Sequence, residues 1–183
     1  MSQLENNTVY MTLNSRGVPG TFHWGLFITT SSAPKGIFYH ASNKTGGWQP
    51  EFKPTAYIFS SMSLVLVFKI GPISSSDRID EVLRAVPADG SASLRTDEAF
   101  TCRIWMKDAL VALHENHVVT LPADIGELQS FTLSSCLFRE DFTNKWCQDT
   151  LEAKAFAAGT AHEHRVERYA AKAIVIDSEG RYV

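Results

Sequence analysis

The feature that most constrains the fold is a run of three short segments near the N-terminus, separated from one another by turn residues. Residues 9–13 (VYMTL), 22–30 (FHWGLFITT) and 36–40 (GIFYH) are rich in β-branched and aromatic side chains, which is typical of strands. The connecting segments are rich in Gly, Pro, Asn and Ser, which favour turns. The sequence therefore predicts an antiparallel meander of three strands.

Alternation within residues 22–30 assigns their side chains to two faces of the predicted sheet. One face carries four large apolar side chains, those of Phe22, Trp24, Leu26 and Ile28. The other face carries His23, Gly25 and Phe27.

Downstream of the meander, the pattern changes from strand-like to helix-like. Residues 41–55 are predicted to form a polar loop, because they are rich in polar residues and include the Gly-Gly-Trp stretch. Residues 56–59 and 64–70 are predicted to form two further strands, the second of them central in the sheet. Apolar positions at helical spacing then predict a helix over residues 79–86, which Pro87 ends.

A second helix is predicted from about residue 98 to about residue 115, and its first residue decides the setting of Cys102. With Thr101 as the N-cap, Cys102 lies in the first turn. With Thr96 or Asp97 as the N-cap, it lies in the second turn, where the helix dipole acts on it more weakly.

The C-terminal part is predicted to be largely helical. Residues 141–170 are rich in Ala, Glu, Lys and Arg, and residues 171–177 (AKAIVID) fit either a short strand or a helix end. Strands followed by helices predict the α+β class. We expect one domain over residues 1–183, with its core motifs in residues 8–115.

Composition excludes several classes of function. The 183 residues are 44% hydrophobic and 20% charged with a net charge of -3, so no excess of cations is available for nucleic acid. Residues 1–7 lack the pattern of a signal peptide, and the longest apolar run, residues 64–68, is too short to cross a bilayer. Three cysteines fit reduced thiols, so a cytoplasmic protein is expected.

One cysteine and two histidines are the strongest candidates for chemistry. A thiol at a helix N-terminus lies in the positive end of the helix dipole, which favours the reactive thiolate, so Cys102 is the candidate nucleophile. His23 is the candidate base, and His40 on the neighbouring strand is the candidate that orients it. Taken singly, Cys102 and His23 are each more simply interpreted as structural residues.

These residues also lie in motifs that resemble a known family. Residues 23–28 (HWGLFI), a short turn and residues 36–41 (GIFYHA) resemble the His-Trp and Val-Ile-His-Leu motifs of the lecithin retinol acyltransferase family, which includes the H-Ras-like suppressor acyltransferases. Residues 102–105 (CRIW) stand where that family has its Asn-Cys-Glu-His-Phe motif. The chain is also similar to small uncharacterised fungal proteins that share the His-Trp and Cys-Arg signatures.

The resemblance implies a permuted papain-like fold, in which the histidine strand precedes the cysteine helix. It implies that Cys102 attacks an ester, amide or thioester carbonyl, with His23 as base and His40 as the third member. Hydrolase, acyltransferase and cyclising enzyme remain open, as does an acyl, peptide or other small-molecule substrate. No metal or organic cofactor is implied. The alternative is a non-catalytic binding protein on the same fold, with Cys102 buried and both histidines held by hydrogen bonds.

Two tryptophans are candidate substrate-binding residues. Trp48 lies in the Gly-Gly-Trp loop and is expected to form a wall of a cleft. Trp24, next to His23, is the second candidate, although a place in the core is its simplest interpretation.

The remaining histidines and cysteines have simpler interpretations. His114 and His117 are expected to favour the negative end of a helix rather than to bind zinc, because no third ligand is evident. The others are expected to be surface or packing residues, namely His162, His164, Cys136 and Cys147.

Overall fold

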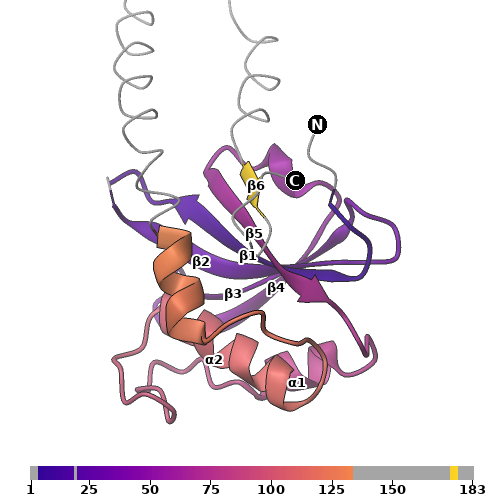
Figure 1. Cartoon of the computed structure of the whole chain (residues 1–183). Helices are drawn as coiled ribbons and strands as arrows, with labels where there is room; N and C mark the ends of the chain where they lie inside the picture. The colour runs from indigo at the N-terminus through magenta and orange to yellow at the C-terminus, as the bar shows by residue number, and fades with distance from the viewer. Residues whose placement is uncertain (1–3, 19, 134–173, 177–183) are drawn as a thin grey trace, which may run out of the picture.

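The computed structural model describes residues 4–18, 20–133 and 174–176 of the chain. The predicted helical segment 141–170 lies outside these residues. The described residues form a mixed α+β structure that is built on one twisted sheet (Figure 1).

The sheet has six strands in the order β4-β3-β2-β1-β5-β6. They are β1 (Thr8–Ser15), β2 (Phe22–Thr29), β3 (Gly36–Ser42), β4 (Gln49–Thr55), β5 (Leu64–Pro72) and β6 (Ile174–Ile176). Neighbours pair antiparallel except β5 and β6, which are parallel. The predicted three-strand meander is confirmed, and it continues into β4.

Two segments differ from the prediction. Residues 49–55 of the expected loop form the edge strand β4 instead, which carries Pro50 and Pro54. Prolines are tolerated at a sheet edge because one side of the strand needs no hydrogen-bond donors. The two prolines therefore favour a loop in the sequence pattern although the segment forms an edge strand. The strand expected over residues 56–59 is instead η1 (Ile58–Ser60), a turn of 3₁₀ helix.

Among the described residues, three helical segments follow β5, namely α1 (Ile79–Ala85), α2 (Cys102–Glu115) and residues 125–133. The Thr101 hydroxyl accepts a hydrogen bond from the Ile104 backbone N–H at 3.2 Å. Thr101 is therefore the N-cap, and Cys102 lies in the first turn of α2. Of the two alternatives for residues 171–177, the structure shows a short strand, β6.

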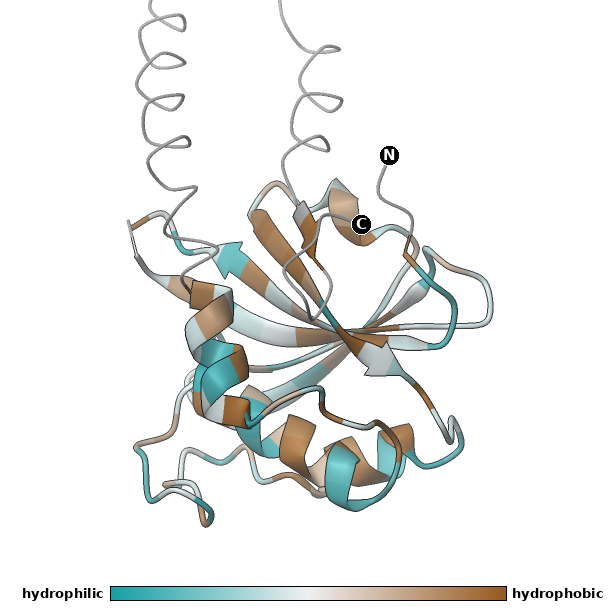
Figure 2. Cartoon of the chain, viewed as in Figure 1, coloured by the Kyte–Doolittle hydropathy of each residue, from teal (hydrophilic) through white to brown (hydrophobic). Residues whose placement is uncertain are grey.

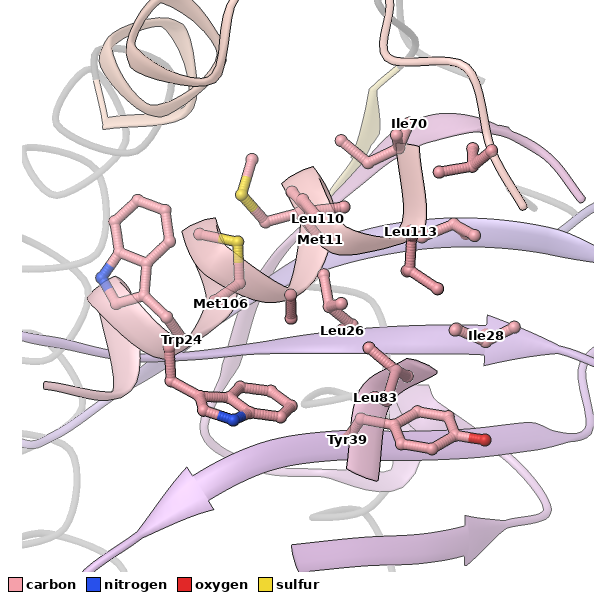
Figure 3. Packing of buried hydrophobic residues seen from close by; sticks show 14 of the residues in the cluster. Met11, Trp24, Leu26, Ile28, Tyr39, Ile70, Leu83, Met106, Leu110 and Leu113 are labelled. Carbon is pink, nitrogen blue, oxygen red and sulfur yellow. The ribbon is translucent and has the colours of Figure 1, made fainter. Parts of the chain in front are cut away.

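One face of the sheet is covered by α1 and α2, and the main core lies between these two layers. Figure 3 shows Met106 and Leu110 of α2 on the side of Trp24 and Leu26 of β2, and Leu113 farther along the helix toward Ile28. The brown stretches of the central strands and helices in Figure 2 mark the apolar residues. This face is the one that the alternation of Phe22, Trp24, Leu26 and Ile28 predicted.

The other face of the sheet carries a smaller apolar cluster near η1. Tyr10, Phe27 and Val67 of the central strands pack there with Ile58 and Phe59. Successive residues of β2 thus divide between two separate cores, since neighbouring side chains of a strand point to opposite faces. Among the described residues, none of the helices combines the length and the apolar character that a membrane crossing requires.

The start of β3 depends on a glycine. Gly36 pairs with Thr29 at the end of the turn between β2 and β3. A Cβ atom at this position would collide with the Ile28 carbonyl oxygen and would lie 2.7 Å from the Phe27 ring. Backbone cannot move aside as a flexible side chain can, so the close approach of the two strands requires the missing side chain.

We therefore expect the substitution Gly36→Ala to lower the free energy of unfolding by about 1–3 kcal/mol. The matched control is Gly47→Ala, because a Cβ atom at Gly47 would meet no atom within 4 Å. Urea unfolding of both variants measures the difference. Equal stabilities would contradict the packing described for β2 and β3.

Candidate functional site

Two imidazoles meet on the sheet face that lies opposite the helices. The Nε2 atom of His23 and the Nδ1 atom of His40 lie 2.8 Å apart, within hydrogen-bond distance. Residues 26–29 of β2 pair with residues 36–39 of β3, and both histidines lie just beyond this paired segment. The structure therefore brings these two candidate residues together, as a Cys–His–His site would need.

A carboxylate extends the pair onto β4. Glu51 is the cross-strand partner of His40, and its Oε2 atom lies 3.5 Å from the Nε2 atom of His40. Lys53, two residues along the same strand, forms an ion pair with Glu51. The Phe38 ring stacks on the His40 ring with centroids 4.6 Å apart. Glu51, His40 and His23 thus form a chain of polar groups that crosses three strands.

Burial keeps both imidazoles neutral at pH 7. Desolvation is the largest cause that lowers the pKa of His23 to about 4, and the positive charge of Arg16 adds to it. Desolvation likewise lowers the pKa of His40 to about 4, with the neighbouring His23 as the next cause. The hydrogen bond from Lys53 is the largest cause that lowers the pKa of Glu51 to about 2. Two neutral imidazoles therefore lie beside an ionised carboxylate.

The histidine pair lines a pocket of about 380 Å³, which we call the histidine pocket. Three cations, Arg16, Lys44 and Lys53, contribute to its wall, and none of the lining residues identified is an Asp or Glu. The chain as a whole has a net charge of -3, so this concentration of positive charge is local. The arrangement favours a negatively charged ligand.

Asn14 lines this pocket and carries a buried donor without a partner in the described part of the chain. Its Oδ1 atom accepts hydrogen bonds from the hydroxyls of Ser61 and Ser63, at 3.4 and 3.3 Å. Its Nδ2 atom is buried and has no hydrogen-bond partner among the described residues. A buried donor without a partner is costly.

Cys102 lies on the other side of the sheet. Its side chain is 3% exposed and packs in the core between α2 and the sheet, the cluster that contains Trp24. Its sulfur makes no hydrogen bond with His23 or His40, and Cys102 is absent from the lining of the histidine pocket. His23 is adjacent to Trp24 in an unbroken stretch of β2, so its side chain points away from α2. The expected Cys102–His23–His40 triad is therefore not assembled in this structure.

The two candidate tryptophans have different positions. Trp48 lines the histidine pocket, as expected for a cleft wall, and its ring lies edge-on to Phe100 with centroids 5.0 Å apart. Trp24 is 4% exposed and belongs to the core under α2. Trp24 is therefore not among the residues that line the histidine pocket.

The remaining candidates do not form a second site. The Nδ1 atom of His114 lies within hydrogen-bond distance of the Val119 carbonyl oxygen and the Leu121 backbone N–H, just after α2 ends. In the part of the chain that the structure describes, no three His, Cys, Asp or Glu side chains are grouped to hold a metal ion. Four candidates lie outside those residues, namely Cys136, Cys147, His162 and His164.

Sequence reasoning missed the residues that give the pocket its charge. The sequence pattern predicts a loop for Glu51 and Lys53, although their spacing of two residues places both on one face once the segment is a strand. Arg16 and Lys44 lie in turns, where no local pattern connects them to a site. Only the pairing of the strands brings these four residues to the two histidines.

The lowered histidine pKa values predict how stability depends on pH. Both folded-state values, about 4, lie below the ordinary value of 6.5, so the unfolded chain binds more protons between these limits. The free energy of unfolding should therefore rise as the pH increases from about 4 to about 6.5. Urea unfolding across this range measures the slope. The double variant His23→Gln, His40→Gln should show a smaller slope, and NMR midpoints near 6.5 for both imidazoles would contradict the prediction.

Comparison with known proteins gives a family but no activity. Residues 9–120 match a family that is described as a family of unknown function (DUF6540). The match extends from β1 past the end of α2, and it includes both histidines, Glu51 and Cys102. No curated protein matches the chain, and no solved structure does. The chain therefore belongs to the DUF6540 family.

Proposed function

We propose that this protein is a non-catalytic binding protein and that the histidine pocket binds a small anionic molecule. The observation that carries the proposal is the division of the candidate residues between the two faces of the sheet. The histidines line a positively charged pocket, while Cys102 is buried under α2.

The charges of the pocket support an anionic ligand. Lys53 is paired with Glu51, whereas the side chains of Arg16 and Lys44 form no ion pair with any described residue. An anion can therefore be attracted without first breaking an existing pair. The volume of about 380 Å³ lies within the usual range for small-molecule sites, roughly 300–1,000 Å³.

The buried thiol argues against cysteine chemistry at this site. A nucleophilic cysteine needs an accessible sulfur and a base within hydrogen-bond reach. Cys102 lies in the first turn of a capped helix, but its side chain is buried and no imidazole reaches it. The permuted papain-like acyl enzyme with Cys102 as nucleophile and His23 as base stays the alternative, and it requires a rearrangement that exposes the sulfur to His23.

Alkylation separates these two proposals. In the variant Cys136→Ser, Cys147→Ser, Cys102 is the only remaining thiol. We expect iodoacetamide to modify it at least about 100-fold more slowly in native buffer than in urea, because the side chain is buried. Mass spectrometry at several times measures both rates. Rapid modification of the native protein, with a rate that titrates below pH 7, would support the acyl enzyme instead.

Anion binding tests the proposed function directly. Inorganic phosphate should shift the NMR signals of His23 and His40, and the affinity should fall as salt is added. The substitutions Arg16→Gln and Lys53→Gln should each weaken binding about two- to fivefold, as expected for an exposed charge.

The matched control is Lys35→Gln, which removes the same charge in the turn between β2 and β3, away from the pocket lining. An equal loss in all three variants would indicate attraction by overall charge and not a site. If phosphate shifts no pocket signal, the proposed function is wrong.

A further inference from the structure

The chain of polar groups from Glu51 to His23 determines which hydrogen bonds a ligand can make in the histidine pocket. The His40 side chain is 3% exposed, and its Nε2 atom makes no hydrogen bond to any described residue. The nearest ionic group is the Glu51 carboxylate, whose Oε2 atom is 3.5 Å away. A proton on Nε2 of His40 is therefore favoured, since it is attracted by the carboxylate charge.

This proton fixes the state of both rings. With Nε2 of His40 protonated and the ring neutral, its Nδ1 atom is an acceptor. The Nε2 atom of His23, 2.8 Å away, must then be the donor of the shared hydrogen bond. His23 is neutral as well, so its Nδ1 atom carries a lone pair and no proton. No described residue donates a hydrogen bond to that atom.

We infer that the histidine pocket selects anions that also carry a hydroxyl group, with phosphorylated polyols as the ligand class. This inference rests on the proposed function and makes it more specific. The anionic group is attracted by Arg16, Lys44 and Lys53. The hydroxyl donates to Nδ1 of His23, which a fully ionised phosphate cannot do.

Three small molecules separate charge from hydroxyl recognition. Glycerol 3-phosphate carries both groups, propyl phosphate lacks the hydroxyls, and glycerol lacks the charge. By isothermal titration calorimetry at pH 8.5, where both phosphates are dianions without an O–H on phosphorus, glycerol 3-phosphate should bind about 3- to 10-fold more tightly than propyl phosphate, as expected for one hydrogen bond. Glycerol alone should show no measurable binding. In His23→Phe, the two phosphates should bind equally.

The outcomes distinguish this inference from the proposed function. If wild-type protein binds the two phosphates equally, the hydroxyl inference is wrong and anion binding stands. If neither phosphate binds, both are wrong. A second arm uses vesicles that contain phosphatidylglycerol, whose headgroup carries the same two hydroxyls on a phosphodiester. Binding to glycerol 3-phosphate without sedimentation on vesicles supports a soluble ligand, and sedimentation supports a lipid headgroup with the same chemistry.

A measurement on the ligand-free protein keeps the inference testable if His23→Phe does not fold. Nitrogen-15 NMR should show His23 protonated on Nε2 and His40 also protonated on Nε2. Glu51→Gln should weaken this preference. The matched control Lys53→Gln removes the ion pair but keeps the carboxylate, and it should leave the preference unchanged. A proton on Nδ1 of His23 in the wild-type protein would overturn the inference.

Discussion

The opposite orientation of two adjacent side chains in β2 organises the whole structure. Trp24 points into the core under α2, and His23 points to the other face. In an extended strand these two side chains must point to opposite faces. A shift of the strand by one residue would bury the imidazole under the helix and expose the indole. The large apolar area of Trp24 therefore fixes the face on which His23 is available to a ligand.

The edge strand β4 turns the histidine pair into a charged site. Its register places Glu51 opposite His40, and the two-residue period of the strand places Lys53 on the same face. The carboxylate is attracted to Lys53 on one side and to the His40 ring on the other. This polar chain ends at His23, at the wall of a pocket whose other charges are positive. The site thus depends on long-range pairing of strands and not on a local motif.

The position of Cys102 shows how one sequence feature can support two interpretations. Thr101 caps α2 and Cys102 is the first residue of that helix, which is the position that a catalytic cysteine would require. A small, weakly polar side chain on the inner face of a helix is equally a good packing residue. The side of the sheet that α2 covers distinguishes the two, and here it favours packing.

The sequence by itself determined the first three strands, the faces of β2 and the limits of α1. It also narrowed the N-cap of α2 to three candidate residues. Each of these follows from local periodicity or from capping, which act over a few residues. Only the tertiary structure decided that residues 49–55 form a strand, because polar residues and prolines at a sheet edge have the same composition as a loop. It also decided that Cys102 and His23 lie on opposite faces and that Arg16, Lys44 and Glu51 gather around the histidines. These are relations between distant segments, which depend on how the strands pair and on which face the helices cover.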